Sequence, residues 1–137
     1  VNLFWPAKKP LLATSSDANN NSLVFKLSYK KMDILFMGDA QLEAISIFIK
    51  SGRLEAEVLK VSHQGSYNGT TKSLLKQVKP KLAVISVGAD NPYGHPHKST
   101  LALLKRFRLS TFRTDKNGTI SVTSNGFSFR AAANVLP

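Results

Sequence analysis

Three short stretches of the sequence place residues that can bind a metal or move a proton at the end of an apolar run. The stretch VLKVSHQGS sets His63 after such a run and follows it with a glycine and a hydroxyl residue. Asp39 ends the run DILFMGD, and His95 and His97 lie in the stretch YGHPH. Imidazole and carboxylate groups serve as general bases and as metal ligands. The three stretches are therefore candidate sites of chemistry.

Each of these residues also has an ordinary structural interpretation. Asp39 stands where it would N-cap a helix that begins near Ala40, and aspartate is a common capping residue. His63 can equally be a loop histidine that packs or caps. His95 and His97 are two residues apart, so in an extended loop they point to opposite sides unless Pro96 turns the chain. Both interpretations stay open on these residues alone.

Polar residues after His63 can bind an anion. Ser66, Asn68, Thr70 and Thr71 can donate hydrogen bonds, and a helix predicted to begin at Thr70 or Thr71 has an N-terminus that attracts phosphate. Helix capping explains the same residues equally well.

The composition excludes several kinds of site. The chain of 137 residues has no cysteine, which rules out disulfides, thiolate zinc sites and cysteine nucleophiles. Walker, GxGxxG and GxSxG motifs are absent, so neither a nucleotide-binding loop nor a serine hydrolase is indicated. Any metal must be held by His, Asp or Asn side chains.

The net charge of +11 is concentrated in the second part of the chain. Residues 1–57 carry seven Lys and Arg against six Asp and Glu, whereas residues 58–137 carry twelve against two. A basic half beside a near-neutral half indicates a surface that meets polyanions such as nucleic acid. The alternative is a lysine-rich solvated surface that only keeps the domain soluble.

The hydrophobic pattern predicts alternating strands and helices in a single domain over residues 1–137. Strands are predicted over residues 22–29, 33–39, 57–62 and 82–88, two or three closing strands within residues 110–130, and helices over residues 40–52, 70–80 and 100–108. Ser99 or Thr100 is expected to cap the last helix, and KNG and SNG are expected to be hairpin turns. Residues 1–21 are interpreted as an extended segment with a polar loop, and residues 131–137 as a tail.

The element order ββαβαβαβββ predicts an α/β fold in which one mixed sheet is faced by helices. In such sheets ligands bind at the loops that follow the carboxyl ends of the strands. Asp39, His63 and the YGHPH loop all occupy that position. Their convergence is stronger evidence for a site than any one of them alone.

Taken in order, six stretches resemble the C-terminal half of the metallo-β-lactamase-like domain of the ComEC family of competence proteins. They are NNNSLVFKL, ILFMGDA, EVLKVSHQGS, VKPKLAVISVGADNPYGHPH, LALLKR and FRTDKNGTI. That family usually has LLTGD, LKVGHHGS, an NxYGHP loop and a closing TD motif. The resemblance runs from about Asn19 to Ile120, and VISVGADNPYGHPH and RTDKNGTI distinguish this group from other metallo-β-lactamase relatives.

The resemblance implies half of an αββα sandwich with a dinuclear metal site, usually zinc and alternatively manganese, between two sheets. Asp39 would match the carboxylate that bridges the two ions, and His63 the last histidine ligand. His95 lies in the GHP motif, where a phosphate contact or a catalytic general acid is expected. The family forms a membrane channel for DNA uptake. The resemblance therefore implies a soluble domain on the extracytoplasmic side of a bacterial membrane, with nuclease activity on DNA.

Two departures from the family pattern limit what this chain can do alone. The family carries an HxHxDH motif upstream, and this chain has no histidine before His63. A further ligand is expected near residues 17–21, where only weak oxygen donors occur. The family's HHGS is HQGS here, so Gln64 removes a contact outside the ligand position.

The chain is therefore interpreted as a partial domain whose metal site is half built. We expect an exposed apolar face that is covered by an N-terminal half-domain or by a second copy of the chain.

Two functions follow as hypotheses. The first is a metal-dependent DNA phosphodiesterase, with this fragment expected to be inactive without its upstream half. The second is a non-catalytic module of the channel, either structural or DNA-binding. In either case the expected phosphate contacts are Ser66, Thr70, Lys72, Lys76, Lys79, Lys105 and Arg106.

Overall fold

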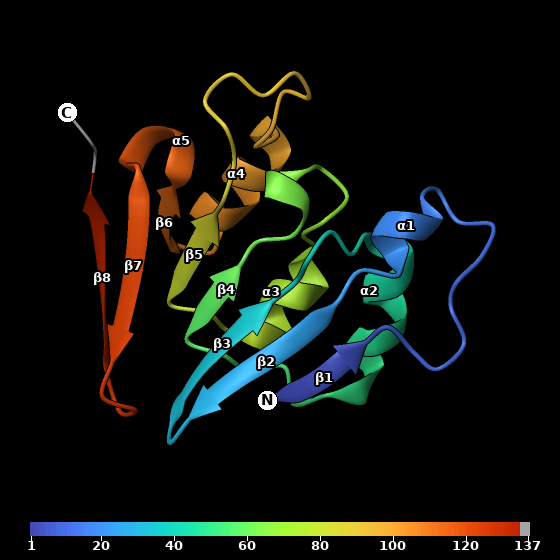
Figure 1. Cartoon of the computed structure of the whole chain (residues 1–137), viewed down its shortest axis with the longest axis horizontal. Coiled ribbons are helices and arrows are strands. Elements are labelled where there is room, and N and C mark those ends of the chain that lie inside the picture. Colours follow the sequence, from blue (N-terminus) through green and yellow to red (C-terminus); the bar gives the residue numbers. More distant parts are fainter. Residues whose placement is uncertain (135–137) are drawn as a thin grey trace.

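The structure is a computed structural model that describes residues 1–134. It contains one six-stranded sheet with helices on one face and a separate β-hairpin (Figure 1). Along the chain the elements are β1 (Asn2–Trp5), α1 (Asp17–Asn20), β2 (Val24–Tyr29), β3 (Met32–Phe36), α2 (Leu42–Phe48), η1 (Ile49–Ser51), β4 (Val58–Lys60), η2 (His63–Gly65), α3 (Lys72–Val78), β5 (Leu82–Ile85), α4 (Lys98–Arg106), β6 (Ser110–Arg113), α5 (Thr114–Asn117), β7 (Thr119–Ser124) and β8 (Phe129–Asn134). Over residues 1–134, every helix is too short or too polar to cross a membrane.

The strands of the sheet lie side by side in chain order, from β1 to β6. β1, β2 and β3 pair antiparallel, whereas β3, β4, β5 and β6 pair parallel. Each parallel connection contains one main helix, α2, α3 or α4, because the chain must return to the start of the next strand. The prediction of an α/β fold with one mixed sheet faced by helices is confirmed.

The face of the sheet that the helices cover holds the main core. Leu35, Leu59 and Ala83 are register partners on β3, β4 and β5, and all three are fully buried. The helices contribute Ile45, Phe48, Leu74, Leu75 and Leu104 to the same core. Burying one such side chain stabilises a fold by about 1.5–3 kcal/mol, so this face contributes most of the hydrophobic stability.

The β7–β8 hairpin covers one part of the opposite face. Met32, Val58 and Leu82 are buried there against Val122, Phe129 and Ala131 of the hairpin. Residues 131–134, predicted as a tail, instead form most of β8, because Ala131 packs on the sheet while the backbone pairs with β7. The rest of the predicted tail, residues 135–137, lies outside the described residues.

The remainder of that face is not covered by the hairpin. Leu3, Phe25 and Phe36 are register partners across β1, β2 and β3, and the two phenylalanine rings stack with centroids 4.7 Å apart. Leu3 is 60% exposed and Leu27, further along β2, is 43% exposed. An exposed apolar surface therefore occurs on this face over β1, β2 and β3.

The first 21 residues are more ordered than the predicted extended segment. They form β1 and the helical turn α1, and the buried side chain of Asn20 joins this segment to α2. Its Oδ1 accepts hydrogen bonds from the backbone N–H groups of Gln41 (3.3 Å) and Ala44 (3.2 Å). The backbone oxygen of Asn20 accepts a hydrogen bond from the indole of Trp5. Asn20 thus caps α2 from another element.

Replacing Asn20 by Ala leaves two buried N–H groups at the start of α2 without their acceptor. We expect the free energy of unfolding to fall by about 2–3 kcal/mol, measured by urea denaturation. Asn19→Ala, one residue earlier in the same turn, is the matched control and should change it by about 0.5 kcal/mol or less. Equal losses in the two variants would contradict the capping role.

The carboxylate of Glu43 fixes the same segment to α2. It accepts hydrogen bonds from the backbone N–H of Ser15 (3.0 Å) and from the side chain of Asn20 (3.1 Å). The Ser15 hydrogen bonds, first of all the backbone one, lower the pKa of Glu43 from 4.5 to about 2. A carboxyl with a lowered pKa in the folded state stabilises the fold above its unfolded pKa. That contribution disappears as the pH falls from 4.5 to about 2.

We therefore expect Glu43→Ala to lower the free energy of unfolding near neutral pH. The loss should become smaller as the pH falls from 4.5 to about 2. Urea denaturation at a series of pH values measures the difference. Glu55→Ala is the control, because Glu55 pairs with Lys79 in full solvent, where screening makes the pair weak. A Glu43→Ala loss that is independent of pH would refute the assignment.

Candidate active site

The loops that follow β3, β4 and β5 meet at one edge of the sheet. The N–H of His63 donates to the carbonyl of Gly38 (3.0 Å), and the N–H of His97 donates to the carbonyl of Gly65 (2.9 Å). A side chain on Gly65 would lie 2.6 Å from the Cβ of Pro96, so only glycine allows the last two loops to pack. The structure thus brings together the three stretches that the sequence singles out.

Asp39 does not cap a helix. The N-cap of α2 is Gln41, and the hydrogen bonds to the first turn come from Asn20. Asp39 instead borders an open hollow on the hairpin side of the sheet, together with Lys60, Phe25 and Phe36. Burial lowers the pKa of Lys60, and the charge of Asp39 partly offsets this effect. The carboxylate makes no ion pair with any residue of 1–134.

The ring of His63 is oriented by Gln41. The side-chain nitrogen of Gln41 lies 3.1 Å from Nδ1 of His63, and the Gln41 oxygen accepts a hydrogen bond from Ser15. In this arrangement Nδ1 is the acceptor and Nε2 carries the proton. A half-turn of the Gln41 amide offers its oxygen to Nδ1 instead, which frees Nε2 for a metal. Gln41 therefore supports either tautomer without moving the ring.

The backbone at His63 has an unusual conformation. His63, Gln64 and Gly65 have φ angles of 43°, 53° and 82° in succession. A left-handed conformation costs a non-glycine residue about 1–2 kcal/mol. The hydrogen bonds from the Gly65 N–H to Ser62 and from the Ser66 N–H to His63 hold the turn in place. Such strain occurs preferentially at functional sites, where the surrounding structure compensates for it.

His95 lies against His63. Their ring centroids are 5.3 Å apart with the planes at 74°, and the buried Nδ1 of His95 has no hydrogen-bond partner among residues 1–134. Burial lowers the pKa of His95, and the neighbouring His63 and His97 lower it further, while Asp39 raises it. The ring is therefore neutral at pH 7, with one nitrogen able to donate and the other able to accept a proton.

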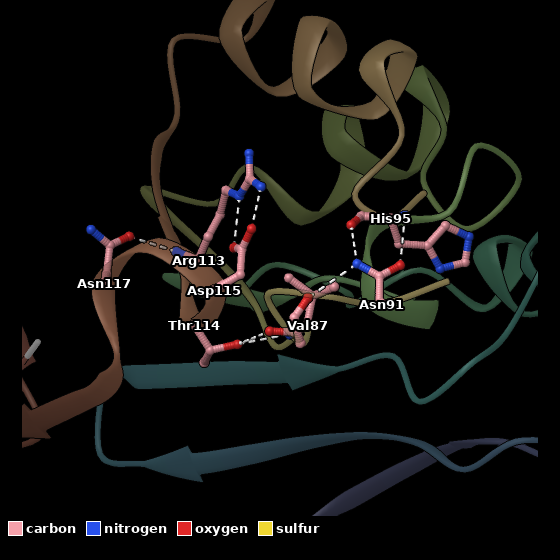
Figure 2. A network of polar contacts seen from close by, with 8 residues as sticks. Val87, Asn91, His95, Arg113, Thr114, Asp115 and Asn117 are labelled. Atoms are coloured by element: carbon pink, nitrogen blue, oxygen red, sulfur yellow. Dashed lines mark hydrogen bonds and ion pairs between the residues drawn. The ribbon is translucent and has the colours of Figure 1, made fainter. Parts of the chain in front are cut away.

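Asn91 holds the backbone on which His95 is placed. Its side chain accepts a hydrogen bond from the His95 N–H (2.9 Å) and donates to the carbonyls of His95 (2.6 Å) and Gly88 (3.1 Å). Figure 2 shows the His95 ring pointing away from this clamp. The loop is thus fixed from one side while the ring stays available on the other.

The start of the same loop is fixed by the RTDKNG stretch. The Thr114 hydroxyl accepts a hydrogen bond from the N–H of Val87 (2.7 Å) and donates to its carbonyl (2.8 Å) (Figure 2). Arg113 forms a two-pronged ion pair with Asp115, which holds the pKa of Asp115 below its usual value. The Arg113 N–H also donates a hydrogen bond to the side chain of Asn117, at the other end of the helical turn α5. The prediction of a hairpin turn at KNG is therefore wrong.

Residues 1–134 do not make a complete metal site by themselves. Within residues 1–134, no three or more His, Cys, Asp or Glu side chains come close enough together to hold a metal ion. Zinc requires at least three protein ligands, and Asp39 and His63 would supply two at most. Residues 17–21 do not add a ligand, because Asp17 accepts hydrogen bonds from the backbone of Ala13 and Thr14, and Asn20 caps α2.

The residues expected to contact phosphate divide into two groups. Ser66 and Thr70 are buried, and the Ser66 hydroxyl donates to Asn68, so neither forms part of the surface. Thr71 caps α3, and His97, rather than Ser99 or Thr100, caps α4. The basic side chains are exposed: Lys72, Lys76, Lys79, Lys105 and Arg106. Of these, Lys79 pairs with Glu55.

Three side chains that build the site were not singled out from the sequence. Asn91 lies in the motif NPYGHPH and Thr114 in the motif RTDKNG. Their place in the two most distinctive motifs of the chain is the feature by which the sequence could have identified them. Gln41 gives no such signal, because its contact with His63 joins residues 22 positions apart.

Comparisons with known proteins identify the family of this chain. The family model described as the metallo-beta-lactamase superfamily matches residues 12–89. ComE operon protein 3 of Bacillus subtilis is 40% identical over 106 residues, which cover 74% of this chain and 13% of the relative. Recombination protein 2 of Haemophilus influenzae is 35% identical over 105 residues, which cover 76% of this chain and 13% of the relative.

The chain thus spans only 13% of the length of each of these two relatives. Both are ComEC-type competence proteins, so the resemblance inferred from the motifs is confirmed over about 75% of the chain. The chain belongs to the metallo-β-lactamase superfamily.

Proposed function

We propose that this chain is the C-terminal part of the metallo-β-lactamase-like domain of a ComEC-type DNA-uptake protein, and that the parent domain is a metal-dependent DNA phosphodiesterase. The observation that carries the proposal is the meeting of Asp39, His63 and His95 at one edge of the sheet, in a basic chain that is 40% identical to ComE operon protein 3. DNA is the substrate that the charge of +11 favours.

In this proposal Asp39 and His63 are two ligands of a zinc or manganese site, and further ligands come from residues outside this chain. Members of the superfamily usually bind metal. Gln41, with its oxygen turned to Nδ1, leaves Nε2 of His63 free for the metal, and His95 beside it contacts a phosphate oxygen or gives up a proton. Asn91 and Thr114 keep His95 in place.

The uncovered apolar surface at Leu3, Phe25 and Phe36 borders the hollow at Asp39, since Phe25 and Phe36 line both. An upstream half-domain that packs on this surface would bring its residues to Asp39. By the same resemblance we place the domain on the extracytoplasmic side of a bacterial membrane, as part of a channel protein.

The second candidate function is a non-catalytic module of that channel, structural or DNA-binding. The incomplete ligand set within residues 1–134 favours it for this chain in isolation. Metal affinity and DNA affinity distinguish the two functions, because the module needs no cation at Asp39.

Addition of Mn²⁺ should broaden the NMR signals of residues 38–41 and 61–65 before those of other segments, because Mn²⁺ accepts carboxylate and imidazole ligands. Asp39→Asn should weaken this broadening about ten-fold, since it removes a direct ligand. Asp90→Asn, which alters an exposed carboxylate in the loop after β5, is the matched control and should leave it unchanged. Broadening that persists in Asp39→Asn would rule out Asp39 as a ligand.

Binding of duplex DNA should depend steeply on salt, because lysine contacts release counterions from the phosphates. Replacing both Lys72 and Lys76 by Ala should make the slope of log K against log salt less negative by about 2, because two phosphate contacts are lost. Lys50→Ala, an exposed lysine of the near-neutral half, should leave the slope unchanged. If the double variant keeps the wild-type slope, α3 does not face the DNA.

A further inference from the structure

Two tyrosines at the candidate site are exposed although they are large aromatic residues. Tyr67 is 68% exposed and Tyr93 is 74% exposed. Tyr67 lies in the loop between η2 and α3, and Tyr93 lies in the loop between β5 and α4. Exposed aromatic rings beside a site require an explanation, because burying them elsewhere would have stabilised the fold.

Both rings contact the His95-Pro96-His97 tripeptide, one at each histidine. The Tyr93 ring stacks on His95 with centroids 6.0 Å apart and planes at 29°. The Tyr67 ring meets His97 edge to face, with centroids 5.8 Å apart and planes at 61°. His95 in turn contacts His63. Tyr93 therefore lies at the candidate reaction centre, and Tyr67 lies beside it, against the histidine two positions further along the same loop.

The backbone that carries these rings is held firmly. The tripeptide is fixed by the hydrogen bonds from Asn91 to His95 and from the His97 N–H to Gly65. The loop of Tyr67 is fixed by the Thr100 hydroxyl, which donates to the carbonyl of Ser66 (2.8 Å). Two exposed rings on fixed loops present faces whose positions are set before a ligand arrives, which lowers the entropic cost of stacking.

The charge around the site indicates the ligand that these faces receive. Residues 58–137, which include both tyrosines, carry twelve Lys and Arg against two Asp and Glu. Lys98, at the first position of α4 next to His97, and Lys72, at the first position of α3, are both exposed. Exposed aromatic rings on loops that lead into helices with a lysine at their first position are suited to a nucleobase attached to a phosphate backbone.

We propose that Tyr67 and Tyr93 form a base-stacking platform that selects unpaired bases of a single-stranded nucleic acid at the candidate site. The inference rests on the proposed action on DNA and names the form of the substrate. In a duplex both faces of each base are covered by its neighbours, so a base can stack on a tyrosine only after it leaves the helix. Lysine contacts with phosphates make no such distinction.

The test separates stacking from phosphate binding with two labelled oligonucleotides of about 12 nucleotides, a length that one single-strand site accommodates. One is oligothymidylate, and the other is its abasic counterpart with the same backbone. Fluorescence anisotropy at a fixed, low salt concentration gives the dissociation constants. We expect the wild-type chain to bind oligothymidylate about ten-fold more tightly than the abasic strand, which corresponds to stacking of one or two bases.

Tyr67→Ala and Tyr93→Ala should each weaken oligothymidylate binding about five-fold or more and leave abasic binding unchanged. Tyr67→Phe and Tyr93→Phe keep the aromatic ring and should bind oligothymidylate with wild-type affinity. These two variants test the role of the ring even if an Ala variant fails to fold. Tyr29→Ala is the matched control, because Tyr29 is 54% exposed but lies at the end of β2. It should leave both affinities unchanged.

Three outcomes would overturn the platform. Equal affinity of the wild-type chain for oligothymidylate and for the abasic strand would overturn stacking. The same would follow if the Ala variants lost affinity for both strands equally, and in both cases the proposed phosphate contacts would stand. Tighter binding of a duplex than of oligothymidylate would overturn the single-strand preference. A wild-type chain that binds none of these probes would overturn both the platform and the proposed action on DNA.

Discussion

The parallel pairing of β3, β4, β5 and β6 is the constraint on which the candidate site depends. Parallel strands end at the same edge of a sheet, so the chain must deliver the loops after β3, β4 and β5 to one place. Backbone hydrogen bonds then join these loops in series, from His63 to Gly38 and from His97 to Gly65. Asp39, His63 and His95 come from segments 24 or more residues apart in the sequence, and this edge is what brings them together.

Much of this arrangement is predictable from local patterns, and the reason is physical. Apolar runs that end in Asp39 and His63 identify buried strands, and a βαβ order places their carboxyl ends together. What the pattern does not contain are hydrogen bonds from side chains to distant backbone. The cap that Asn20 gives α2 and the bonds of Thr114 to Val87, 27 residues away, depend on tertiary packing. For the same reason KNG looks like a hairpin turn in isolation and is a helical turn in the fold.

The two faces of the sheet differ in a way that affects the site. The helix face holds the main core, whereas the β7–β8 hairpin packs on the opposite face over β3, β4, β5 and β6 and leaves β1 and β2 without cover. The apolar surface left at Leu3, Phe25 and Phe36 continues into the hollow that contains Asp39. Apolar surface beside a free carboxylate is unfavourable for an isolated domain, because the surface lacks cover and the charge lacks a partner. One additional segment could supply both, which links the incomplete ligand set to the incomplete sheet packing.

The strain at the site argues against a purely structural role for the histidine loops. His63 and Gln64 adopt left-handed conformations, and Nδ1 of His95 is buried without a partner among residues 1–134. Loops that only connect β4 to α3 and β5 to α4 have no need of these costs, since a glycine or an exposed polar residue would avoid them. The molecule nevertheless surrounds these costs with supporting hydrogen bonds from Gln41, Asn91 and Thr114. Strained backbone and unpaired buried polar atoms that neighbouring side chains stabilise are typical of a site whose residues are positioned before a ligand binds.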